Sequence, residues 1–245
     1  MLVVNSAFCA SSALLLIYLA QVLGFPLITA LLAALAYLAD FAVSNLQLSA
    51  LVDSAECFLM ICVFMACLQR RWVLLPAIGI LGALAKETIL PLAFLFLLGW
   101  IWHEERKPWL WLVVMVLAAF ATLILVRSAI TGHLITPWEI ATEERNVHDL
   151  RQFWIASISI VGSWTFWMAF VWMLPFAAYG MDRLPVAARS ATLLAVAGAL
   201  ALSVWNWAGG NAVRPVFDVA AAYLCLAFSI GVTRLSAMPG FTARK

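Results

Sequence analysis

Charged side chains are too scarce in this chain to cover the surface of a water-soluble globule. Only 11% of its 245 residues are charged, whereas 66% are hydrophobic. An ordinary soluble domain carries about 25% charged residues, and most of them lie on its outside. Lipid must therefore be the solvent for most of the chain. We predict an all-α, polytopic integral membrane protein, a helical bundle in which residues 1–245 form a single transmembrane domain with the lipid bilayer as its first partner.

The net charge, the tryptophans and the cysteines indicate which partners and sites to expect of this membrane protein. The formal net charge is +2 and no basic stretch suits nucleic acid, so we expect no nucleic-acid partner. Twelve Trp residues are typical of bilayer interfaces. The five cysteines form no CxxC pair and have no histidine at metal-ligand spacing, so we interpret them as small apolar packing residues.

Short polar segments divide the chain into hydrophobic runs. A helix needs about 20 apolar residues to cross a bilayer, and the chain is long enough for about nine such helices. The predicted spans are 3–23, 25–43, 48–69, 72–86, 88–102, 108–127, 152–178, 190–208 and 216–234.

The run from Trp72 to Trp102 is too long for one span. A single helix of this length would reach ~46 Å, against a hydrocarbon core of ~30 Å. Basic residues flank it on both sides, which places both of its ends in the cytoplasm. Its only internal charges, Lys86 and Glu87, lie at its midpoint. We therefore predict a hairpin of two short helices with Lys86 and Glu87 at the far surface. The alternative is one long tilted helix with a buried ion pair, which is costly at mid-bilayer.

The basic residues orient the bundle. With the flanks of the hairpin in the cytoplasm, nine Lys and Arg lie on the inner side and five on the outer side. The five outer residues are Lys86, Arg127, Arg145, Arg151 and Arg214. Residues 128–151 then form an outer loop, and Met1 also lies outside. We expect either a chain that starts outside the cytoplasm or an N-terminally shortened chain that has lost a preceding span. We expect the inner (plasma) membrane of a bacterium, with the active face extracytoplasmic.

Polar residues gather at the predicted outer ends of the spans, where charges indicate function by default. Asp53 and Glu56 are three residues apart and share one helix face. Lys86 and Glu87 tip the hairpin, and Arg214 opens the last span. These five residues are the candidate site.

Each of these features also has a purely structural interpretation. Lys86 can snorkel to the headgroups. Arg214 precedes a proline that suits the first turn of a helix, and Asp218 can complement the dipole of that helix. Asp53 and Glu56 can form an interhelical polar contact. The histidines form no HExxH motif, so we predict no metal ligands.

The motifs that are absent favour a lipid-borne donor. The sequence contains no Walker motif, no GxSxG and no dinucleotide fingerprint. A lipid-linked phosphosugar would place its phosphate at headgroup level, where Lys86 and Arg214 supply cations. Transfer of the sugar to a hydroxyl also requires a carboxylate base.

Two segments carry a resemblance to a known family. The stretch from Arg70-Arg71-Trp72 through Gly82-Ala83-Leu84-Ala85-Lys86-Glu87-Thr88 to Pro91 resembles the GT-C glycosyltransferases that use polyprenyl-phosphate sugars, among them the protein O-mannosyltransferase and aminoarabinose transferase relatives. The late segment Gly209-Gly210-Asn211-Ala212-Val213-Arg214-Pro215 is similar to the late outer loop of that family. The large first outer loop of the family, which carries its acidic catalytic residue, has no counterpart here.

The resemblance implies a GT-C-like membrane glycosyltransferase that moves a sugar from polyprenyl phosphate to an extracytoplasmic acceptor. Lys86 and Arg214 would bind the donor phosphate. Glu87 would orient Lys86 or contact the acceptor, and Asp53 and Glu56 would line the cavity. The catalytic residues stay unassigned, no cofactor is expected beyond the lipid-linked sugar as co-substrate, and a divalent metal is not required.

Two other classes of function fit the same sequence. A transporter or flippase for a lipid-linked or small substrate would carry its charges at mid-depth in repeated halves, and the sequence has no internal repeat. A non-catalytic membrane subunit would pack against a membrane protein partner through small residues. Such residues occur at Ala33, Ala34, Ala197 and Gly198.

Overall fold

The computed structural model describes residues 2–48, 53–105, 107–134, 150–205 and 212–237, and over these residues the chain is helical without strands. The α-helices are α1 (Leu2–Val22), α2 (Leu27–Ala39), α3 (Asp53–Leu68), α4 (Leu75–Ala85), α5 (Ile89–Ile101), α6 (Trp109–Thr131), α8 (Leu150–Val161), α9 (Trp164–Phe170), α10 (Leu174–Gly180), α11 (Val186–Trp205) and α12 (Val213–Ser236). Short π and 3-10 helices are η1 (Val43–Gln47), η2 (Trp72–Leu74) and η3 (Met181–Arg183). The predicted helical class is confirmed, and it follows from the need of an apolar chain to satisfy its backbone internally.

Among the described residues, fewer helices are long enough to cross a membrane than the nine spans that the sequence predicts. Four helices of the described chain, α1, α6, α11 and α12, are long and apolar enough to cross a membrane. Helices α4 and α5 have 11 and 13 residues. At 1.5 Å per residue they rise only about 17 and 20 Å, short of the ~30 Å hydrocarbon core. Nine spans are therefore not confirmed.

The predicted span 152–178 is broken. Arg151–Ile160 and Trp164–Arg183 meet at a bend of 48°, and the pair counts as a fifth crossing only if both parts form one span. A second break precedes α10, which has Pro175 in its first turn. Proline lacks the N–H that a continuing helix needs, so it favours a new helix start here. The predicted outer loop 128–151 also begins later, because α6 continues to Thr131 and ends at Gly132 with a left-handed φ of 76°. Residues 135–149 of that loop lie outside the described residues.

The predicted break in the run 72–102 is confirmed. Helix α4 ends at Ala85, Lys86 has an extended backbone (φ −167°, ψ 133°), and α5 begins at Ile89. The two helices approach closely beside the turn, since a Cβ on Gly82 would lie 2.7 Å from Cγ2 of Ile89. The alternative of one long helix is therefore wrong.

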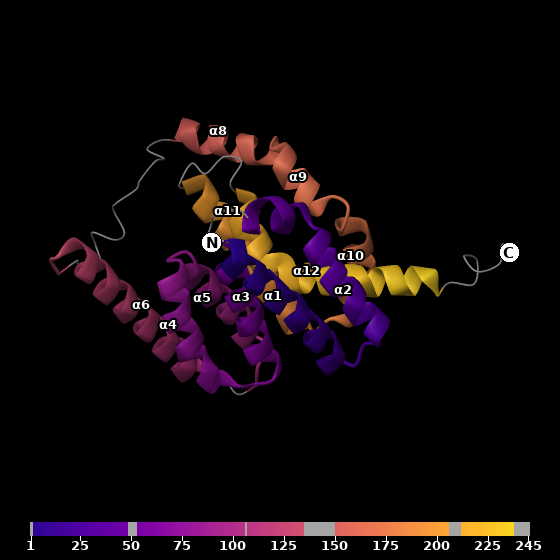
Figure 1. Cartoon of the computed structure of the whole chain (residues 1–245), viewed down its shortest axis with the longest axis horizontal. Helices are drawn as coiled ribbons and strands as arrows, with labels where there is room; N and C mark the ends of the chain where they lie inside the picture. Colours follow the sequence, from indigo (N-terminus) through magenta and orange to yellow (C-terminus); the bar gives the residue numbers. More distant parts are fainter. Residues whose placement is uncertain (1, 49–52, 106, 135–149, 206–211, 238–245) are drawn as a thin grey trace.

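Helix α12 forms the centre of the bundle. It packs against α2, α3, α10 and α11, and most of its residues are buried. Figure 1 shows it running through the middle of the molecule, with α4, α5 and α6 at one end. Its contact with α10 is close, since a Cβ on Gly231 would lie 1.9 Å from the Phe176 carbonyl oxygen.

The small residues predicted to face a partner mostly pack within the chain. Ala33 and Ala34 are buried in α2, which contacts α1 and α12. A Cβ on Gly198 of α11 would lie 2.1 Å from Cδ1 of Leu95 on α5. Of the four, only Ala197 is exposed.

Gly231→Ala should destabilise the bundle, because the added methyl group forces α10 and α12 apart. Overpacking of this kind costs about 1–3 kcal/mol, which an SDS unfolding titration in detergent micelles measures. Ala121→Leu on the exposed side of α6 is the control and should stay within about 0.5 kcal/mol of wild type. An unchanged unfolding midpoint for Gly231→Ala would contradict the close helix contact.

The two ends of α5 should be reached from opposite sides of the membrane. The side chain of Glu87 is 47% exposed before α5, and Glu105 is exposed after it. With the five native cysteines replaced, an impermeant maleimide added outside should label Glu87→Cys at once. It should label Glu105→Cys only after the membrane is permeabilised. Labelling of both positions from one side would rule out the predicted hairpin topology.

Candidate functional site

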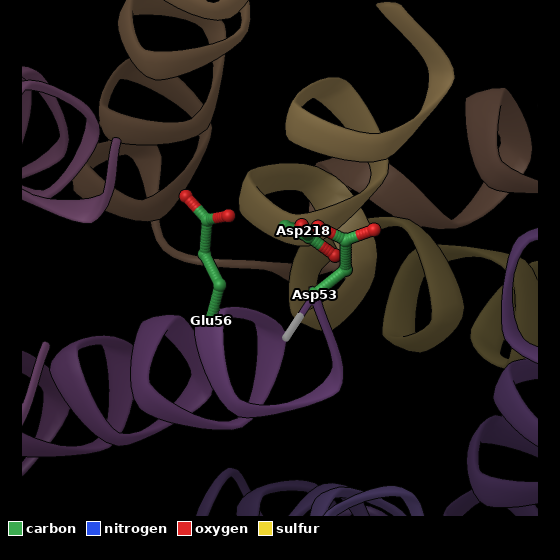
Figure 2. A group of neighbouring side chains, drawn as sticks. All are labelled: Asp53, Glu56 and Asp218. Carbon is green, nitrogen blue, oxygen red and sulfur yellow. The ribbon is translucent and has the colours of Figure 1, made fainter. Parts of the chain in front are cut away.

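The first turn of α3 places two carboxylates inside the bundle. Asp53 and Glu56 are both buried, and their spacing brings them to one side of the helix, as the sequence predicts. Figure 2 shows both side chains extending from α3 toward α12, which carries Asp218. Carboxylates at this depth need positive partners, because an unpaired buried charge is strongly destabilising.

Lys86 supplies the first positive charge. Its Nζ atom lies 2.7 Å from Asp53 Oδ1 and 2.6 Å from Glu56 Oε2. Thr88, two residues after Lys86, donates its hydroxyl to Glu56 Oε1 at 2.7 Å. Lys86 therefore does not simply snorkel to the headgroups, since its ammonium group reaches inward to α3.

The carboxylates keep Lys86 charged. Lys86 lies in the turn between α4 and α5, outside both helices. Burial alone would lower the pKa of its ammonium group, but the nearby carboxylates of Glu56, Asp218 and Asp53 outweigh this effect and raise the pKa of Lys86 above its usual value. The site thus contains a permanent cation at neutral pH.

Arg214 supplies the second positive charge. It lies in the first turn of α12, and its Nε is 3.5 Å from Asp53 Oδ2. Lys86 and Arg214 thus contact the two oxygens of one carboxylate. Their side chains are 23% and 26% exposed, whereas that of Asp53 is 3% exposed. The cations therefore lie between the buried carboxylate and the surface.

Glu87 lies in the turn between α4 and α5, as the sequence predicts, but its ion-pair partner is not Lys86. It forms an ion pair with Arg127 of α6, and the described partners of Lys86 are Asp53 and Glu56 instead. The described residues thus show no contact of Glu87 with Lys86, and the alternative role of Glu87, contact with the acceptor, stays a prediction. The two side chains leave the turn in different directions because one meets α3 and the other meets α6.

Asp218 is a member of this site that the sequence predicts only as a partner of the helix dipole. It is 1% exposed, and its Oδ1 accepts a hydrogen bond from Gln47 Nε2 at 2.9 Å. The oxygen Oε1 of Gln47 in turn accepts from the Tyr37 hydroxyl at 2.7 Å. The spacing of Asp218 four residues after Arg214 is a sequence signal for a shared helix face. No such signal exists for Gln47 or Tyr37.

The ion pairs of Lys86 should contribute substantially to stability. Lys86→Ala leaves two buried carboxylates without their nearest cation, at a cost of about 3–5 kcal/mol. The double variant Lys86→Ala/Asp53→Ala should lose at least about 1 kcal/mol less than the sum of the two single variants, because the effects of contacting residues are not additive. Glu87→Ala is the control and should cost less than about 1 kcal/mol, since its ion pair is partly exposed.

A double-mutant cycle from SDS unfolding in detergent measures this coupling. If the effects of Lys86→Ala and Asp53→Ala simply add, the ion pair does not contribute as the geometry implies.

Comparisons of the chain with protein-family models, with curated proteins and with solved structures find no match.

Proposed function

We propose that this chain transfers a sugar from a polyprenyl-phosphate donor to an acceptor outside the cytoplasm, as its resemblance to the GT-C glycosyltransferases implies. The observation that carries the proposal is the convergence of Lys86 and Arg214 on Asp53, with both cations partly exposed above buried carboxylates. An anion that approaches from the surface meets these cations first. A phosphate group is well matched to them, because arginine binds phosphate oxygens through two N–H groups and lysine acts as a point charge.

The surroundings of the two cations suit a lipid donor. Leu81 and Leu84, on α4 just before Lys86, are each more than half exposed. In a bilayer this surface contacts acyl or prenyl chains. A polyprenyl phosphate lying along α4 would bring its headgroup to Lys86.

The reaction is a displacement at the anomeric carbon. The acceptor hydroxyl oxygen forms a bond to this carbon while the bond from the carbon to the phosphate oxygen breaks. Polyprenyl phosphate leaves with the bonding electron pair, and the acceptor proton passes to a carboxylate base. Lys86 and Arg214 would stabilise the charge that develops on the leaving phosphate.

Donor binding tests this proposal directly. The protein is reconstituted in nanodiscs, and binding of a fluorescent polyprenyl monophosphate is titrated for wild type, Lys86→Ala, Lys86→Gln and Arg214→Gln. A lost charge-assisted hydrogen bond is worth about 1.5–3 kcal/mol, so each variant should bind at least about tenfold more weakly. Arg71→Gln at the opposite end of the hairpin is the matched control and should bind as wild type does.

The variants must also remain inserted and folded, which their melting curves report. Wild-type affinity in folded Lys86 and Arg214 variants would refute the phosphate site.

A second candidate function is transport. It is favoured by the three carboxylates of Asp53, Glu56 and Asp218, all buried within an apolar bundle, since intramembrane charges of this kind often serve ion-coupled carriers. Counterflow of a labelled polyprenyl-phosphate sugar in proteoliposomes, without release or transfer of the sugar, would favour this alternative.

The alternative of a non-catalytic membrane subunit has less support, because three of the small residues expected to face a partner, Ala33, Ala34 and Gly198, pack within the chain. Co-purification of a membrane protein that supplies an acidic outer loop would restore it.

A further inference from the structure

Three carboxylates meet in one place, from two helices that lie far apart in the sequence. Oxygen atoms of Asp53, Glu56 and Asp218 lie within 4.8 Å of one another. Each of the three residues is at most 2% exposed. Figure 2 shows the carboxylates of Asp53 and Asp218 next to each other, with Glu56 one turn further along α3. We refer to these three residues as the carboxylate cluster.

The cluster lacks one positive charge. Its three carboxylates face two cations, Lys86 and Arg214, and among the described residues these cations form ion pairs only with Asp53 and Glu56. Asp218 receives a neutral hydrogen bond from Gln47 on one oxygen. Its other oxygen, Oδ2, is buried and has no hydrogen-bond partner in the described part of the chain.

This unpartnered oxygen points to a ligand. A buried carboxylate oxygen without a partner is costly, and a native structure usually satisfies it with water, an ion or a proton. The oxygen belongs to α12, whereas the other two carboxylates belong to α3, so the vacant acceptor does not arise from crowding within one helix turn. The Lys86 ammonium already shows that a cation is accommodated between Asp53 and Glu56.

The chemistry of the donors selects the class of cation. All three ligands are carboxylate oxygens, which prefer hard divalent ions such as Mg²⁺ and Mn²⁺. We infer that the carboxylate cluster is a binding site for one such ion, and that the Lys86 ammonium competes with the ion for Asp53 and Glu56. The sequence, which lacks a metal motif, predicts no metal ligands, because Asp218 lies far from the other two along the chain.

The inference connects to the sugar-transfer reaction, and this link rests on the proposed function. Lys86 is the partly exposed member of its ion pairs, so a donor phosphate at the surface would draw its ammonium group outward. The divalent ion would then take the place of that group between the carboxylates. Binding of the ion itself requires no donor.

Manganese binding tests the site without any lipid donor. The purified full chain in nanodiscs is titrated with MnCl₂, and the loss of the free Mn²⁺ signal is followed by electron paramagnetic resonance. Wild type should bind one ion, and Lys86→Gln should bind it at least about tenfold more tightly, because the competing charge is gone. Asp218→Asn should weaken binding at least about tenfold in either background. MgCl₂ should displace the bound Mn²⁺.

Glu87→Gln provides the matched control. It removes a carboxylate next to Lys86 in the chain, but one that pairs with Arg127 outside the cluster. Its Mn²⁺ affinity should equal that of wild type. If Lys86→Gln fails to fold, the Mn²⁺ affinities of Asp218→Asn and wild type still show whether the carboxylate cluster binds the ion. The shifts of their melting temperatures on addition of MnCl₂ provide a second measurement.

Several outcomes would overturn the site. Equal Mn²⁺ affinity of wild type and folded Lys86→Gln would show that the ammonium does not compete. Unchanged binding by Asp218→Asn would place the ion elsewhere. A wild-type melting temperature that responds to pH but not to Mn²⁺ would show that a proton, not a metal ion, neutralises the cluster. If Mn²⁺ binds as expected but polyprenyl monophosphate does not, the proposed function fails and the cation site stands.

Discussion

The contact of Lys86 with Asp53 and Glu56 is the interaction on which the arrangement of this bundle depends. In an apolar bundle a buried charge is tolerated only when it is paired, so this contact fixes the turn between α4 and α5 against the start of α3. The ion pair of Arg214 with Asp53 brings the start of α12 to the same place. Three separate segments thus meet at one polar centre, while apolar packing holds the rest of their lengths.

The layered order of charges at this centre makes the proposed binding of an anionic substrate compatible with its excess of carboxylates. The carboxylates of Asp53 and Glu56 are almost fully buried, whereas Lys86 and Arg214 are each about a quarter exposed. The surface that a phosphate meets is therefore cationic, and the acidic groups lie beneath it. Asp218 is buried, and its hydrogen-bond partner among the described residues is the neutral Gln47, which is why we infer a further cation in the deeper layer.

Breaks within the apolar runs separate the predicted spans from the observed helices. Hydropathy detects an apolar run but not whether the run is one straight helix, and the predicted span 152–178 contains α8, α9 and α10. The short helices α4 and α5 pack against α6 and α11, and both are apolar although each is shorter than the hydrocarbon core. Apolar composition alone does not fix the length of a helix.

The sequence by itself determined the helical class, the break at Lys86 and the placement of Asp53 and Glu56 on one helix face, because these depend on composition and on spacing within a few residues. Only the tertiary structure decided that Lys86 meets α3 while Glu87 meets Arg127, since neighbouring side chains diverge according to which helix packs beside them. It also decided that Asp218 joins the cluster. Its hydrogen-bond partner Gln47 lies 171 residues away in the chain, and such a contact exists only once the helices have packed.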